Sequence, residues 1–368
     1  MDWLTASEAL ALLGTQPQTL YANVSRGRIK ARPDPLDSRR SLYRGDDVRR
    51  LAQRTAGRRK QETVAVQAMQ WGEPVLPTSI STVRDGRLLY RGEDACCLAD
   101  QAKLEEVAEL LWQAPIQFSA LEGPAQGLPG AFLALAEQAG HDVASARSGS
   151  AAEASLVLSI IAHHLAGGSV SFPLHIRLSR HWQAPAAADI IRRALVLLAD
   201  HELNSSTFAA RVAVSTGASL WAGTLAALAT LRSPRHGLAS RHVAALAEDV
   251  GSAADPEAAL REWLGEGRAV PGVGHPLYPD GDVRCQALLQ SFEAPFDYLR
   301  FADAATEVTG DAPNIDFALA AMRARFSLPA DAGIILFALA RSVGWQAHML
   351  EQVASGKQIR PRARYTGP

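Results

Sequence analysis

Histidine, aspartate and arginine side chains stand at several breaks between apolar segments of this 368-residue chain. The polar run Asp200–Phe208 directly follows an apolar helical segment, and burying such a cluster is costly unless it faces a cleft. His236 follows a helix stop at Ser233-Pro234, and His275 follows two glycines that are typical of a tight turn. These positions predict a site that is assembled from helix ends and turns.

The candidate site contains three histidines, one aspartate and three arginines: His201, His236, His275, Asp316, Arg284, Arg341 and Arg360. A guanidinium group matches a carboxylate through two parallel hydrogen bonds, so the arginines predict an anionic ligand, most simply a dicarboxylate. The histidines and the aspartate predict general acid–base chemistry.

Other kinds of site have weaker support. Three histidines suit a metal ion, but no HxH or HExxH spacing occurs. The Gly272-x-Gly274 pair lacks both the preceding strand and the third glycine of a dinucleotide-binding loop. No GxSxG motif supports a serine nucleophile, and each histidine alone could be a structural residue. Cys96, Cys97 and Cys285 include no CxxC pair, which is typical of a reduced compartment.

The elements that carry these residues read as helices. Ala and Leu are abundant while aromatic residues make up only 6%, and from residue 95 onward apolar residues recur at helical spacing. Strand signals in this part are confined to residues 86–92. A hydrophobic content of 48% excludes wholesale disorder, and the apolar runs are too short for a membrane span. With no signal peptide apparent, we predict an all-α body in a cytoplasmic enzyme or regulator.

The N-terminal segment differs in charge from the rest. Residues 1–60 contain 13 Lys/Arg and 6 Asp/Glu, a balance of +7, whereas the other 308 residues carry 24 − 32 = −8. Capping by Thr5 or Ser7 predicts a first helix that ends at Gly14, and a second helix is expected from Gln16 to Val24. A basic hairpin and a third helix from Asp46 follow.

This arrangement resembles the small winged helix-turn-helix heads of the MerR and excisionase type. The resemblance rests on Leu4–Ala9, Thr19-Leu20-Tyr21 and the Arg39–Tyr43 wing. It implies contact with duplex DNA through residues 1–60. The alternative is a head that now serves only in packing or dimerisation, with its arginines on a solvated face. Residues 54–70, which are charged and Gln-rich, read as a linker or as the end of a linking helix.

The body, over roughly residues 65–368, resembles the citrate synthase family. The resemblance is carried by four ordered motifs: Asp200–Val212, which reads DHELNSSTFAARV; Gly274-His275 with Arg284; Asn314–Phe317 with Arg341 and Val343-Gly344-Trp345; and Ile359–Gly367, which reads IRPRARYTG.

The resemblance implies an all-α fold with a large helical domain, 61–244 and 341–368, and a smaller one, 245–340, after the head at 1–60. Carried over, the catalytic residues are His236, His275 and Asp316, and the substrate-binding residues are His201, Arg284, Arg341 and Arg360. Asp316 would be the base, while His236 would bond the thioester oxygen and His275 the keto oxygen. Arg360 would reach the site of the other subunit, which implies a homodimer. No metal and no cofactor are implied.

The implied activity is the condensation of acetyl-CoA, or propionyl-CoA, with oxaloacetate to give citrate, or 2-methylcitrate, and CoA. The alternative is a DNA-binding regulator whose citrate synthase-like body senses a metabolite. The presence of every implied catalytic side chain favours the enzyme.

Overall fold

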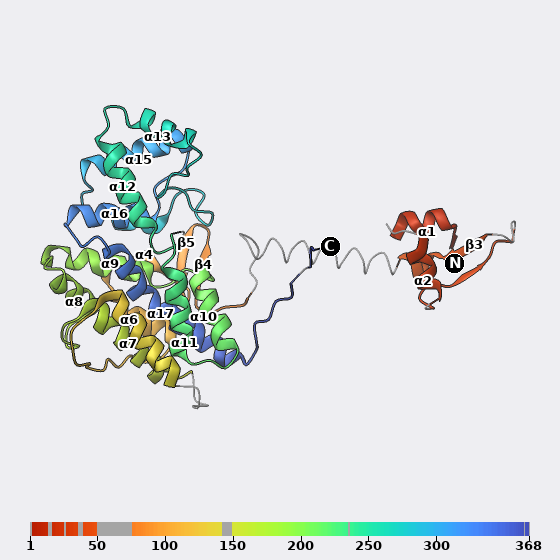
Figure 1. The fold of residues 1–368 in the computed structure, drawn as a ribbon, viewed down its shortest axis with the longest axis horizontal. Coiled ribbons are helices and arrows are strands. Elements are labelled where there is room, and N and C mark those ends of the chain that lie inside the picture. Colours follow the sequence, from red (N-terminus) through yellow and green to blue (C-terminus); the bar gives the residue numbers. More distant parts are fainter. Residues whose placement is uncertain are drawn as a thin grey trace. The chain divides into compact units, whose positions relative to one another are not determined.

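The computed structural model describes residues 2–13, 17–25, 27–35, 40–49, 76–141, 149–234, 236–363 and 365–367. It separates into two compact units, one spanning residues 1–77 and the other residues 78–368. Figure 1 shows the helices and strands of both units.

The first unit combines two helices with a three-stranded antiparallel sheet. Its elements are β1 (Trp3–Leu4), α1 (Ala6–Leu13), α2 (Pro17–Ser25), β2 (Ala31–Pro33) and β3 (Ser41–Arg44), with sheet order β1-β3-β2. Residues 45–49 then form a helical turn. A small apolar core joins them, formed by Ala9, Leu13, Leu20, Ile29, Tyr43 and Val48.

The predicted helices of this unit are confirmed where they are described. Thr5 caps α1 as expected, because its Oγ1 accepts from Glu8 N while the Glu8 carboxylate accepts from Thr5 N. The hairpin of β2 and β3 occupies the position of the predicted wing. Strand β1 was not predicted. Gly14, Gln16, Arg39, Leu51 and the predicted linker at 54–70 lie outside the described residues.

The second unit is predominantly helical. Its helices are α4 (Ala95–Gln101), α5 (Leu104–Trp112), α6 (Gly127–His141), α7 (Ala151–Ala166), α8 (Leu174–His181), the 3₁₀ turn η2 (Pro185–Ala187), α9 (Ala188–Leu198), α10 (Ser205–Ser215), α11 (Leu220–Leu231), α12 (Ala239–Ser252), α13 (Pro256–Gly265), α14 (Val283–Leu289), α15 (Phe296–Thr309), α16 (Ile315–Arg325) and α17 (Ala332–Ser355).

Helix α17 is the centre of this unit. Every residue from Ala332 to Met349 is buried, as expected for a mostly apolar helix that other helices enclose. Helices α5, α7, α9, α10 and α11 pack around it. Helices α12, α13, α15 and α16 pack together and form the upper part of the second unit in Figure 1. The polar residues within this buried stretch of α17 are Arg341, Ser342, Gln346 and His348.

The second unit contains a small sheet that begins earlier in the chain than the sequence predicted. It consists of β4 (Ser81–Arg84), β5 (Arg87–Tyr90) and β6 (Glu93–Asp94), all antiparallel, so strand begins five residues before the predicted segment at 86–92. The first strand was missed because Ser-Thr-Val-Arg carries little apolar alternation. In the part of the chain that the structure describes, the all-α prediction is therefore confirmed only as a predominance of helix, beside two three-stranded sheets.

The predicted division into a large and a small helical domain at 245–340 stays a prediction, as does the end of the head at residue 60. Among the described residues, no helix combines the length and the apolar character that a membrane crossing needs.

Candidate active site

The loop that carries His201 is held by the β4–β5 hairpin. Glu202, at the tip of this loop, has a left-handed φ of 50°, and its carboxylate accepts from Val83 N at 2.6 Å. The Tyr90 hydroxyl lies within 3.2 Å of the Asp200 carbonyl oxygen and binds the end of α9. The hairpin thus fixes the backbone that follows α9.

The same loop is tied to α17 through Asp200. Its fully buried carboxylate accepts from Ser81 Oγ, and from His348 Nε2 at 3.0 Å. His348 Nδ1 lies 3.4 Å from a guanidinium nitrogen of Arg211, which can only donate, so the His348 proton is on Nε2. Gly344 N also donates to the Ala199 carbonyl at 3.1 Å. A Cβ at Gly344 would collide with Asp200, so this approach requires glycine.

His201 is buried and pairs with a tyrosine. Its Nε2 lies 2.9 Å from the Tyr278 hydroxyl, and its ring centre lies 5.1 Å from that of His275. Burial lowers the pKa of His201 well below its usual value, and the positive charges of Arg284 and Arg341 lower it further. His201 is therefore a neutral hydrogen-bonding group at neutral pH.

His275 sits in the predicted glycine turn. Gly272 and Gly274 both have positive φ, 84° and 68°, and the turn bonds the segment before α16: Gly274 N donates to Ala312 O, and Asn314 N to Gly272 O. His275 Nδ1 accepts from Leu277 N at 3.2 Å, which leaves Nε2 as the proton-bearing nitrogen. Burial, and then Arg284, lower its pKa to about 4.

His236 follows α11 and bonds the first turn of α10. Its Nε2 lies 2.9 Å from Ser206 Oγ, which also lies 2.7 Å from Asn204 Oδ1 and accepts from Trp345 Nε1. The Ser206 hydroxyl can therefore donate either to Asn204 or to His236, and when it donates to His236 the imidazole proton is on Nδ1. Burial, with Arg341 nearby, lowers the pKa of His236 to about 4.

Asp316 lies in the first turn of α16, after the N-cap Asn314. Its Oδ1 is buried without a hydrogen-bond partner among the described residues. Burial raises its pKa to about 7, against the lowering effect of Arg284. A carboxylate with a pKa near neutrality and an unpaired oxygen is suited to accept a proton at neutral pH.

Arg284 and Arg341 supply positive charge from two sides. Both are buried. Arg341 donates from Nε to the Leu198 carbonyl at 2.9 Å, and this bond leaves its two terminal nitrogens for another acceptor. Arg284 lies beside the Tyr278 ring and forms a double hydrogen bond with Asp282.

The structure thus brings six of the seven predicted residues together and leaves one apart. His201, His236, His275, Arg284, Arg341 and Asp316 share one electrostatic neighbourhood, as their mutual effects on pKa show. Arg360 lies instead in the exposed C-terminal segment after α17.

Three further residues contact the site without having been predicted to do so: Tyr278, Ser206 and Asp282. Each stands inside a motif that already held a predicted residue. A search of those motifs for buried hydroxyl and carboxyl groups could have found all three.

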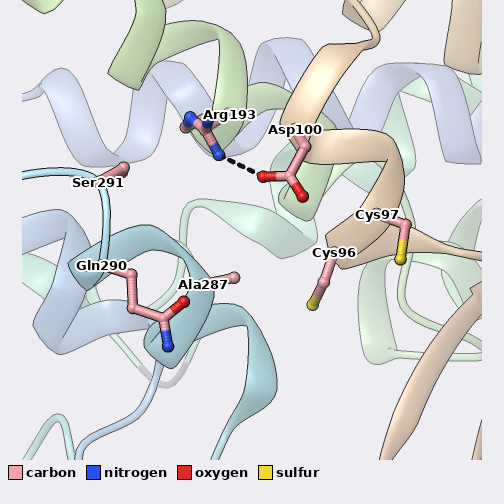
Figure 2. Close-up of a pocket in the computed structure, with 7 residues that line it drawn as sticks. All are labelled: Cys96, Cys97, Asp100, Arg193, Ala287, Gln290 and Ser291. Carbon is pink, nitrogen blue, oxygen red and sulfur yellow. Dashed lines mark hydrogen bonds and ion pairs between the residues drawn. The ribbon is translucent and has the colours of Figure 1, made fainter.

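A separate pocket has a volume of about 340 Å³. Figure 2 shows that α4, α9 and the α14 region line it, through Cys96, Cys97, Asp100, Arg193, Ala287, Gln290 and Ser291. Arg193 is bonded there to Asp100 at 2.7 Å. This pocket contains none of the predicted site residues. The described residues include no group of three His, Cys, Asp or Glu side chains that could hold a metal ion.

Comparison with known proteins decides the family. Residues 176–362, just over half of the chain, match the family model described as citrate synthase, C-terminal domain. The chain belongs to the citrate synthase family. The matched segment contains all seven predicted site residues of this citrate synthase family member.

Individual relatives agree with this assignment. The chain is 34% identical over 195 residues to "Citrate synthase 2" of Bacillus subtilis, covering 50% of this chain and 52% of the relative. It is 33% identical over 196 residues to "2-methylcitrate synthase 2" of Corynebacterium glutamicum, covering 50% of each chain. The chain therefore spans about half the length of the curated relatives that it matches.

The solved structure of citrate synthase from the archaeon Thermoplasma acidophilum, a ternary complex with carboxymethyl coenzyme A and oxaloacetate, has the same fold. The TM-score is 0.64 at 22% identity, over 80% of this chain and 94% of that one.

Proposed function

We propose that the protein condenses an acyl-CoA with oxaloacetate and water to give citrate, or a substituted citrate, and CoA. The observation that carries this proposal is the composition of the site. A carboxylate with a raised pKa, Asp316, lies among neutral histidines and two buried arginines. This set matches the needs of a reaction that forms an enolate and adds it to a ketone.

The first step requires a base and a hydrogen-bond donor at the same time. The α-proton of a thioester is very weakly acidic, so a carboxylate removes it only if the developing enolate oxygen is stabilised at once. Asp316 takes the proton, and His236 donates to the thioester oxygen from Nδ1 when Ser206 bonds its Nε2. With a pKa of about 4, His236 acts as a neutral donor.

The second step adds the enolate carbon to the keto carbon of oxaloacetate. His275 donates from Nε2 to the keto oxygen, since its Nδ1 is already bonded to Leu277 N. His201 helps hold the acceptor, and Arg284 and Arg341 bind its two carboxylates. Fixing the angle of attack in this way lowers the barrier by several kcal/mol. Water then hydrolyses the thioester, and closure of the 245–340 domain keeps water out until that stage.

The remaining features of the proposal concern the acyl group, the assembly and the compartment. Acetyl-CoA is the first choice and propionyl-CoA the second, a choice supported by relatives named for each product. The enzyme is a cytoplasmic homodimer that needs no metal or cofactor, with Arg360 completing the partner's site.

A second function is supported by the N-terminal unit. We propose that it is a winged helix-turn-helix head that binds duplex DNA through its hairpin, so that the protein also acts as a regulator. Arg28 and Lys30, in the segment that leads into β2, and Arg32, within β2, are exposed. The Arg32 guanidinium lies 4.3 Å from the Trp3 ring centre. Such a row of cations is suited to phosphate contacts. Helix α2 contributes the exposed Tyr21 but no charged residue.

The condensation is tested by release of the CoA thiol. Purified protein with acetyl-CoA should release thiol only when oxaloacetate is present, and propionyl-CoA should be compared under the same conditions. Mass spectrometry should identify citrate or 2-methylcitrate as the second product. If acyl-CoA is hydrolysed at the same rate with and without oxaloacetate, or not at all, the proposed reaction is wrong.

The role of Asp316 is tested by substitution and by pH. Because its raised pKa keeps the carboxyl protonated in acid, kcat/KM should rise with pH through about 7 and level off above it. Asp316→Asn should lower kcat by about 10³-fold or more while oxaloacetate still binds. Asp331→Asn, outside the site, is the control. Near-normal turnover by Asp316→Asn would exclude it as the base.

Duplex binding is tested in the full chain by its salt dependence. Replacing Arg28, Lys30 and Arg32 with Ala should weaken binding and reduce the slope of log affinity against log salt by about 3, one for each lost phosphate contact. A control with Arg261 and Arg268 replaced in the second unit should retain the slope. An unchanged slope in the hairpin variant, or no duplex affinity at low salt, would count against a DNA-binding head.

A further inference from the structure

Asp282 is a buried carboxylate to which the proposed reaction assigns no part. It is 2% exposed, and its side chain accepts four hydrogen bonds. Oδ1 accepts from the backbone N and the Nε of Arg284, at 3.0 and 2.9 Å. Oδ2 accepts from Arg284 Nη2 at 2.8 Å and from Ile315 N at 3.0 Å. Each oxygen of the Asp282 carboxylate therefore accepts from two donors.

These four bonds join two helices of the site at their N-termini. Asp282 is the N-cap of α14, whose second residue is Arg284. Ile315 is the first residue of α16, whose second residue is Asp316. One carboxylate therefore lies between the residue proposed to hold the acceptor and the residue proposed to remove the proton.

We propose that Asp282 is a positioning residue that aligns the acceptor-binding Arg284 with the base Asp316. The proposal rests on the condensation described above and deepens it. The double hydrogen bond fixes the plane of the guanidinium group, because Nε and Nη2 are both engaged and only Nη1 takes no bond from Asp282. The bond to Ile315 N fixes the start of α16 relative to that plane.

The charge of Asp282 also acts on Asp316. The charged groups that influence Asp316 are Asp282 and Arg284 from α14 and its N-cap, and Arg341 from α17. The negative charge of Asp282 raises the pKa of Asp316, while the two arginines lower it. If the carboxylate at 282 becomes an amide, the raising influence is lost and Arg284 is no longer balanced. Both changes lower the pKa of Asp316, so the base remains ionised in more acidic solution.

Asp282→Asn separates positioning from a simple loss of folded protein. The amide keeps an oxygen for the α14 cap, but its NH₂ takes the place of Oδ2 and opposes both donors that Oδ2 served, Arg284 Nη2 and Ile315 N. We expect the KM for oxaloacetate to rise about 10- to 100-fold, the effect of losing charge-assisted hydrogen bonds. We also expect the acid limb of kcat/KM to move to lower pH by about one unit. A smaller folded fraction would lower only the apparent kcat, and would change neither the KM for oxaloacetate nor the pH of the acid limb.

The matched control is Asp255→Asn. Asp255 is the N-cap of α13 and accepts from Ala258 N at 3.0 Å, so it is a helix-capping aspartate that lies outside the site. This variant should retain the wild-type KM and pH profile.

A second variant, Ile315→Pro, removes the N–H that donates to Asp282 Oδ2 and leaves the Asp282–Arg284 pair in place. Residue 315 is the first position of α16, where proline is favoured. Ile315→Pro should lower kcat and leave the KM for oxaloacetate within about threefold.

The outcomes distinguish this proposal from the condensation itself. If wild type releases no CoA thiol, the proposed reaction fails, and calorimetric binding of oxaloacetate then tests Asp282 alone, with weaker binding expected in Asp282→Asn. If wild type is active but Asp282→Asn keeps both its KM and its acid limb, Asp282 has no positioning role. If Asp282→Asn does not fold, an unchanged kcat in Ile315→Pro overturns the proposal, and the expected fall in kcat at constant KM supports it.

Discussion

The carboxylate of Asp200 is fully buried, and three segments that are distant in the sequence meet at it. Ser81 approaches from the β4–β5 hairpin, His348 comes from α17, and the loop that bears His201 begins with Asp200 itself. A buried carboxylate without such partners would carry a large desolvation cost, so these contacts cannot be lost singly without penalty. Burial alone would raise the pKa of Asp200, but the hydrogen bonds from His348 and Ser81, with the positive charge of Arg341, outweigh it and hold that pKa below its usual value. The position of His201, and through Tyr278 that of the His275 turn, depends on this junction.

Burial also accounts for the chemical character of the site. It lowers the pKa values of His201, His236 and His275 and raises that of Asp316, because in each case the charged form is disfavoured. The result at neutral pH is a set of neutral donors beside a carboxyl group that is close to its titration point. Arg284 and Arg341 remain charged, which suits the binding of a dicarboxylate. Burial therefore provides both the neutral hydrogen-bond donors and the carboxylate base that the proposed reaction needs.

The sequence predicted most of the helices that the structure describes, and six of the residues that lie near one another in it, because residue type and spacing report on helix ends and turns. The helix cap is recognisable in the sequence from Thr5, and the turn before His275 from Gly272 and Gly274. The motifs, with the helix stop before His236, contain the six site residues that lie near one another in the structure. The contacts between segments could not be predicted in this way. The Asp200–His348 pair spans 148 residues and the Ser81 contact 119, and no local spacing encodes such a distance. Strand β4 was missed because its pairing with β5, rather than its own composition, makes it a strand.

The most direct test of this account is the stabilisation that oxaloacetate gives to Asp200→Asn in urea unfolding. A ligand that binds only the folded state raises the unfolding midpoint by an amount that grows with the logarithm of its concentration relative to its Kd. Wild type and Asp189→Asn, which alters the ion pairs of the exposed Asp189 with Arg192 and Arg193 on α9, should show the same increase in midpoint. The account predicts that Asp200→Asn unfolds at lower urea and that oxaloacetate no longer raises its midpoint measurably. An Asp200→Asn protein that is stabilised by oxaloacetate as strongly as wild type would contradict it.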